Sequence, residues 1–207
     1  MTSELWLTFV AVVIVFAIIP GPTVILVVGQ AISHGRKSVL PLVAGVLLGD
    51  FLAMSLSLAG LGALLATSSE LFLVLKWFGV VYLVYLGVCT WREEPNATAG
   101  GLAVSSGSRS GLFKSSFLVT ALNPKDIVFF VAFLPQFINP ESAVLPQLVV
   151  LMFTFLFIIS ITISSFAVFA GIIRHKIQTY KARKRLNRIG GGALVGAGIL
   201  ASTMQRN

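Results

Sequence analysis

"FAIIPGPTVILVV" (residues 16–28) places two prolines and a glycine in a run that has no charge and almost no polar side chain. Proline inside a helix removes a backbone hydrogen bond and clashes with the preceding turn, which costs roughly 3 kcal/mol. Irregular backbone at membrane depth is tolerated only where protein or a water-filled cavity satisfies the freed groups. The stretch therefore predicts a broken helix, with either a cavity or a tightly covered structural kink at the break.

The composition is that of a membrane protein. Of the 207 residues, 57% are hydrophobic and only 11% are charged, and the mean hydropathy is +0.96. A soluble domain of this size needs far more polar surface. A spanning helix needs about 20 predominantly apolar residues. We expect an all-α integral membrane protein with six transmembrane helices, at residues 5–32, 39–67, 71–89, 112–138, 144–173 and 186–204.

The basic residues indicate the topology. All of the 15 Lys and Arg residues except Lys76, Lys125 and Arg206 lie in or beside the loops that follow the first, third and fifth predicted spans. Basic residues gather on the cytoplasmic side of membrane proteins. These loops are therefore predicted to be cytoplasmic, with both termini periplasmic. The formal charge of +8 then reflects membrane topology and requires no nucleic-acid partner.

The chain divides into two halves around a small, polar, glycine-rich segment at residues 92–111, which we expect to be a flexible cytoplasmic linker. The third and sixth predicted spans repeat Leu, Gly, Leu, Val and Gly at identical spacing, and "VLP" opens the second and the fifth. Glycine-rich apolar helices also produce such matches by coincidence. An odd number of spans per half would give repeats of opposite orientation, as in many secondary transporters. We predict one transmembrane domain, residues 1–207, made of two inverted three-helix repeats, residues 1–91 and 112–207.

Glycines four residues apart allow helices to approach closely. Such pairs are Gly45 with Gly49 and Gly192 with Gly196. We interpret them as sites of packing within the bundle, and the alternative is a homo-oligomer interface.

A second break is predicted at "NPKD" (residues 123–126), about a dozen residues into the fourth span. The motif interrupts the helix and places Lys125 and Asp126 near the middle of the membrane. Asp50 lies about ten residues into the second span and so at a similar depth. A charge near the bilayer centre costs at least ~2.5 kcal/mol on insertion scales, so these groups should face the bundle interior. These groups form a functional site, or else Lys125 forms an ion pair with Asp126 or Asp50 that only holds helices together.

Both predicted breaks turn a helix N-terminus towards mid-membrane. The half-helices after Pro22 and Pro124 run in opposite directions, and each N-terminus carries partial positive charge. Lys125 adds a full positive charge, so an anionic group, most simply a carboxylate, is expected to bind there. Asp50 or Asp126 is expected to receive an ammonium group or to carry a proton, because burial favours the protonated form of a carboxyl group. A small zwitterion suits such a site.

Several longer motifs match one known family in order and over essentially the whole chain. They are "PGPTVILVVGQAISHGRKS" (20–38), "AGVLLGD" (44–50), "LKWFGVVYLVYLG" (75–87), "NPKDIVFFVAFLPQF" (123–137) and "LNRIGGGALVGAGIL" (186–200). The chain resembles the LysE/RhtB-type amino-acid exporters. The resemblance implies a bacterial inner-membrane protein that exports amino acids or close derivatives, with proton exchange as the driving force. It does not identify the substrate.

The resemblance and the two breaks together suggest the site residues. Substrate binding is assigned to the residues at the breaks, namely Pro20, Gly21, Pro22, Thr23, Asn123, Pro124 and Lys125. Proton or charge coupling is assigned to Asp50, which lies in the "GD" found in many relatives of the RhtB branch, and to Asp126. The polar residues that follow the first break are expected to line a path or to bond between helices; they are Thr23, Gln30 and Ser33. Three phenylalanines after the second break are expected to gate or stack, with at least one facing lipid, namely Phe129, Phe130 and Phe133.

Two other classes of function fit the sequence less well. An integral-membrane enzyme needs a nucleophile–base pair or metal ligands, but His34 and His175 lie apart, Cys89 is the only cysteine, and no metal or phosphate motif is present. A passive channel would favour continuous polar stripes along its pore. We therefore expect a transporter without cofactor or metal, whose partners are the lipid bilayer, an amino-acid-like substrate and protons. A channel, or the same fold exporting another small solute, is the alternative.

Overall fold

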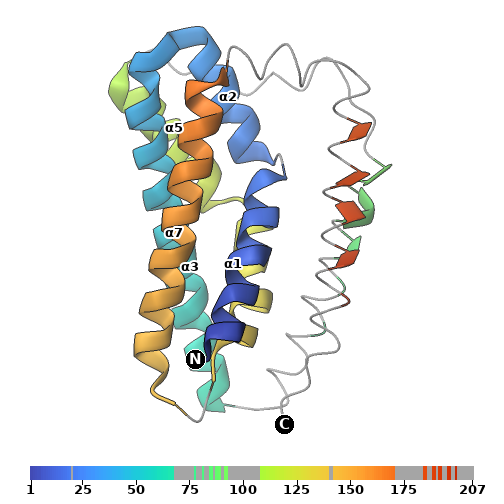
Figure 1. Cartoon of the computed structure of the whole chain (residues 1–207). Helices are drawn as coiled ribbons and strands as arrows, with labels where there is room; N and C mark the ends of the chain where they lie inside the picture. The colour runs from blue at the N-terminus through green and yellow to red at the C-terminus, as the bar shows by residue number, and fades with distance from the viewer. Residues whose placement is uncertain are drawn as a thin grey trace.

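The computed structural model describes residues 1–19, 21–67, 108–139 and 142–170, together with 77, 81, 84–85, 87–89, 91–92, 184–185, 188–189, 191–192, 195–196 and 199. In this part of the chain every regular element is helical, as the sequence predicts (Figure 1). By length and composition, two helical stretches are apolar enough to cross a membrane, namely Pro22–Gly60, which includes the turn at Gly35–Ser38, and Val144–Val168. A third is present if the bent pair Arg109–Ala121 and Pro124–Phe137 is one span. The predicted spans at 71–89 and 186–204 lie largely outside the described residues.

The first predicted span is broken where its prolines lie. Helix α1 (Ser3–Ile18) ends just before the "PGP" motif, and helix α2 (Pro22–His34) begins with Pro22 in its first turn. Proline suits that position because the first N–H groups of a helix have no partner within it. The N-terminus lies at one end of the bundle, and α1 and α2 follow each other along its length (Figure 1).

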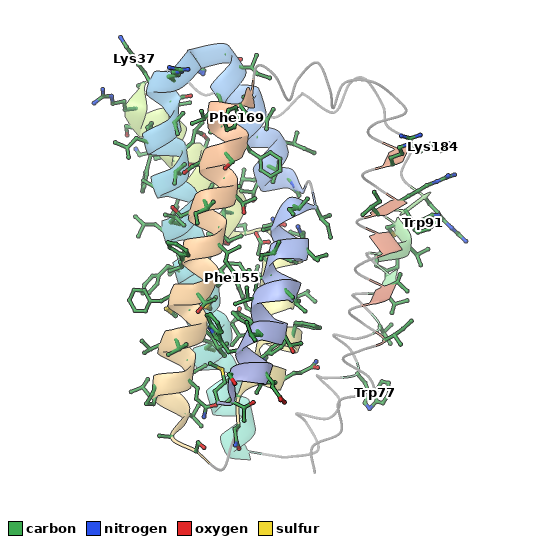
Figure 2. All side chains as sticks on the ribbon, in the orientation of Figure 1. Lys37, Trp77, Trp91, Phe155, Phe169 and Lys184 are labelled. Carbon is green, nitrogen blue, oxygen red and sulfur yellow. The ribbon has the colours of Figure 1, made fainter. Side chains whose placement is uncertain are left out.

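A tight turn at the far end of α2 reverses the chain. Gly35 has a φ of 68°, the left-handed region that favours glycine, and its N–H donates to the carbonyl of Ala31. A 3₁₀ turn, Gly35–Ser38, then leads into helix α3 (Val39–Thr67). The basic side chain of Lys37 projects from this end of the bundle (Figure 2).

Close packing of α3 against helix α5 (Arg109–Ala121) depends on two glycines. A Cβ at Gly45 would collide with Ser116 Oγ and would lie 2.5 Å from the carbonyl oxygen of Phe113. A Cβ at Gly49 would lie 2.8 Å from the carbonyl oxygen of Phe117 and 2.9 Å from Thr120 Cβ. The first glycine pair therefore packs helices within the bundle. In the second pair, a Cβ at Gly192 would lie 3.1 Å from Trp91 Cζ3, and among the described residues no atom lies within 4 Å of a Cβ at Gly196.

Substituting alanine at Gly49 should lower the melting temperature of the protein in detergent. The added methyl group meets backbone atoms that cannot move aside, and such overpacking costs about 1–3 kcal/mol. Gly29→Ala is the matched control, because no described atom outside its own stretch of helix lies within 4 Å of the added Cβ. Equal melting temperatures for the two variants would show that α3 and α5 do not pack as described.

The second break lies between α5 and helix α6 (Pro124–Val128), where the helix axis bends by 43°. After α6 the helix changes form twice, first to a π-helical turn at Phe129–Phe133 and then to a 3₁₀ turn at Leu134–Phe137. Such changes of helical form often mark functional positions or strained sequence.

Helix α7 (Val144–Val168) packs with one face against α1, α2 and α3. Its buried residues recur every four positions, namely Gln147, Leu151, Phe155, Ile159, Ile163 and Ala167. Phe153, Phe157 and Ile161 lie on the opposite face and are exposed, as expected for a face in contact with lipid. Figure 2 shows Phe155 among the helices, part-way along α7.

Candidate functional site

The two breaks meet inside the bundle. A Cβ added to Gly21 would lie 3.4 Å from Lys125 Cδ and 3.7 Å from Lys125 Nζ. Thr23 Oγ1, in the first turn of α2, accepts a hydrogen bond of 3.3 Å from Asn123 Nδ2. It also lies 3.3 Å from Thr120 Oγ1, at the end of α5. Residues about a hundred positions apart in the sequence therefore share one polar network.

Asn123 organises the second break. Its Oδ1 accepts a 3.1 Å bond from the N–H of Lys125 and so caps α6. Its Nδ2 donates to Asp126 Oδ2 over 2.7 Å as well as to Thr23. Asn123 is 3% exposed. The side chain thus joins the two breaks and fixes one oxygen of Asp126.

Lys125 reaches across to the first break. Its ammonium donates to the carbonyl oxygens of Phe16 (3.0 Å) and Ile19 (3.1 Å) and lies 4.0 Å from the centre of the Phe16 ring. The last carbonyls of a helix have no partner within it and carry partial negative charge, so a lysine there stabilises the end of α1. These described partners take two of the three ammonium protons, and neither partner is Asp126 or Asp50.

Two carboxyl groups are buried near this lysine. Asp126 is held by Asn123, whereas Asp50, on α3, is 3% exposed and its Oδ1 has no hydrogen-bond partner in the described structure. Asp50 interacts electrostatically with both Asp126 and Lys125. Burying a carboxyl oxygen without a hydrogen-bond partner raises the free energy of the folded protein. We therefore infer that this oxygen binds a proton or a hydrogen-bond donor of a ligand.

The other predicted residues fall into different environments. Gly21 is half-buried and Thr23 is buried, whereas the side chains of Pro22 and Pro124 are exposed, so the prolines shape the breaks rather than fill the interior. Pro20 lies outside the described residues. Gln30 is buried and its Oε1 has no partner among them, while Ser33 is exposed and bonds to the carbonyl of Gly29.

The sequence interpretation was wrong about one set and missed two residues. Phe129, Phe130 and Phe133 are all buried, so none of them faces lipid. Thr120 and Phe16 were missed. The sequence gives a weak indication for Thr120, because it lies four residues after Ser116, and two polar residues at this spacing share one face of a helix. In the structure both are buried on α5. Phe16 takes part through its ring and its backbone carbonyl, and a sequence carries no signal for the carbonyl.

Comparison with known proteins decides the family. The sequence pattern of the LysE type translocators matches residues 14–205. The chain belongs to the LysE type translocator family. As a member of a translocator family it is a membrane protein and not an enzyme, in agreement with the sequence-based expectation.

Relatives of this LysE-family protein align over almost its whole length. An uncharacterized membrane protein of Vibrio cholerae is 32% identical over 203 residues, which is 98% of each chain. The homoserine/homoserine lactone efflux protein of Salmonella typhimurium is 34% identical over 204 residues, again 98% of each chain. The leucine efflux protein of an Enterobacter species is 32% identical over 192 residues, covering 90% of this chain and 88% of the relative. No solved structure matches.

Proposed function

We propose that this LysE-family protein exports an amino acid or a close derivative across the bacterial inner membrane. Relatives that align along nearly the whole chain are named for efflux of leucine and of homoserine or its lactone. Leucine and homoserine share an α-carboxylate and an α-ammonium group and differ in their side chains. We therefore look for a site that binds the shared groups.

The observation that carries this proposal is the position of the Lys125 ammonium beside Gly21, at the N-terminus of α2. Gly21 has no side chain with which to cap the first N–H groups of α2, whereas Asn123 caps α6. An anion is stabilised by a helix N-terminus and by a lysine. A substrate carboxylate bound between Lys125 and α2 would satisfy both.

The carboxyl groups complete the proposed site. Asp50 and Asp126 lie close enough to Lys125 for their charges to interact. We assign to Asp50 the role of receiving a proton or the substrate ammonium, and the absence of a described partner for its Oδ1 supports this assignment. Alternate use of this oxygen by a proton and by substrate would couple export to proton entry.

The same proposal includes the architecture inferred from the sequence. Both breaks have proline in the first turn of the following helix, a shared design that supports two inverted three-helix repeats. The proposal also includes six spans, a cytoplasmic linker at residues 92–111 and periplasmic termini, which rest on the apolar runs and on the positions of the basic residues in the sequence. Because Gly45 and Gly49 pack within the bundle, the homo-oligomer alternative rests on the second pair, Gly192 with Gly196.

Counterflow in proteoliposomes tests the proposed function. Vesicles loaded with unlabelled leucine or homoserine should accumulate the labelled compound, with saturable kinetics and faster flux under an imposed pH gradient. Vesicles without protein are the control. Conductance that neither saturates nor responds to the gradient would instead indicate a passive channel.

A further inference from the structure

A continuous set of aromatic rings fills the half of the bundle that contains α1. Successive rings touch from Phe16 to Phe129 (4.3 Å between centroids), Phe129 to Phe133 (5.4 Å), Phe133 to Phe137 (5.4 Å) and Phe137 to Phe9 (5.1 Å). Phe130 and Phe155 pack against the side of Phe129. All of these side chains are buried. We call the five successive rings the aromatic column.

The column begins at the candidate site. Lys125 lies over the ring of Phe16 and bonds to its carbonyl, so the first ring and the site lysine are in direct contact. On the other side of the site, the buried polar residues belong to α2 and α5 and include Thr23, Gln30, Ser116 and Thr120. Between the site and the N-terminal end of α1 the described interior is therefore mainly aromatic, with one buried polar residue, Gln147, which bonds to the backbone of Asn139.

One feature would allow the aromatic column to move, and another holds it in place. Phe129 and Phe133 are the ends of the π-helical turn, which contains more residues per turn than an α-helix. Conversion of this turn to an α-helix would rotate the residues on one side of it by about 100°. The end of α1 is held to α6 by the two hydrogen bonds of the Lys125 ammonium.

We propose that the aromatic column is the gate between the site and the N-terminal end of α1. We call Lys125 its latch, because its two hydrogen bonds to the end of α1 keep the gate closed. This inference rests on the proposed function. A substrate carboxylate competes with the carbonyls of Phe16 and Ile19 for the ammonium protons, because a carboxylate is the stronger acceptor. Once those bonds weaken, the end of α1 and the Phe16 ring are free to leave Phe129. Substrate binding thereby opens the gate.

Thiol accessibility tests the gate without requiring transport. Cys89 is the only cysteine, so Cys89→Ser provides a cysteine-free background. Thr23→Cys then reports on the site, and Ser3→Cys, at an exposed position, identifies the side on which α1 begins. A membrane-impermeant thiol reagent is applied to sealed vesicles of each orientation, and the rate of labelling at position 23 is measured.

Phe129→Ala should raise that rate roughly tenfold or more from the side that labels Ser3→Cys, because removing a large buried ring leaves a cavity in the column. Lys125→Met should also raise it, since the latch is lost. Phe157→Ala is the control, as Phe157 is exposed on α7, and it should leave the rate unchanged.

An unchanged labelling rate in a Phe129→Ala protein that remains folded at the labelling temperature, below its own melting temperature, would overturn the gate. Unchanged labelling in Lys125→Met alone would overturn the latch. Neither result depends on counterflow, so failure of this inference is distinguishable from failure of the proposed function.

Discussion

Replacing Lys125 with methionine should reduce counterflow of the exported amino acid by about 100-fold, which corresponds to the roughly 3 kcal/mol of a strong charge-assisted hydrogen bond. Methionine keeps much of the volume of the lysine stem but has no charge and no proton to donate. The substrate carboxylate would then face only the N-terminus of α2. Initial counterflow rates in proteoliposomes of matched protein content measure the effect.

Lys114→Met is the matched control, because Lys114 is exposed on α5 and lies in the same half of the chain. It should transport at the parental rate. The Lys125 variant loses two hydrogen bonds to α1, so its melting temperature in detergent is recorded beside its flux. Parental flux in a folded Lys125→Met protein would show that the lysine serves only to hold α1.

Asp50→Asn should separate exchange from coupling. Asparagine has nearly the shape of aspartate, but it neither ionises nor carries a transferable proton. We expect counterflow at zero pH gradient to persist at a reduced rate, because the substrate ammonium loses a charged partner, while the acceleration caused by an imposed gradient is lost. The ratio of initial rates with and without the gradient is the quantity to measure, and in the variant it should fall to about 1.

Glu4→Gln provides the control for Asp50→Asn, since Glu4 is exposed in the first turn of α1. Its gradient ratio should match that of the parent. If Asp50→Asn keeps the parental ratio, the coupling group is another residue, and Asp126→Asn is then the variant to examine.

The positions of the breaks were predictable because proline chemistry is local. Proline cannot continue an α-helix, so "PGP" and "NPKD" define the starts of α2 and α6 from the sequence alone. The burial of Asp50 and Asp126 was predictable for a similar reason, because a charge within an apolar span is stable only inside the bundle.

The partners of Lys125 were not predictable in the same way. It bonds to backbone carbonyls more than a hundred residues earlier in the chain, and every residue type has such a carbonyl. Nor did hydrophobicity separate the buried phenylalanines from those facing lipid. Lipid tails are as apolar as a protein core, so Phe129 in the column and Phe157 on the outer face of α7 have the same sequence signal.

Capture of a carboxylate at Lys125 is tested most directly by comparing leucine with its decarboxylated amine. Binding of each compound to the detergent-solubilised protein is measured by isothermal titration calorimetry, with homoserine and its own decarboxylated amine as a second pair. We expect at least one amino acid to bind, its amine not to bind, and the Lys125→Met variant to bind neither. Equal affinity for the amino acid and its amine, or undiminished affinity in the variant, would mean that the helix breaks and Lys125 do not hold the carboxylate.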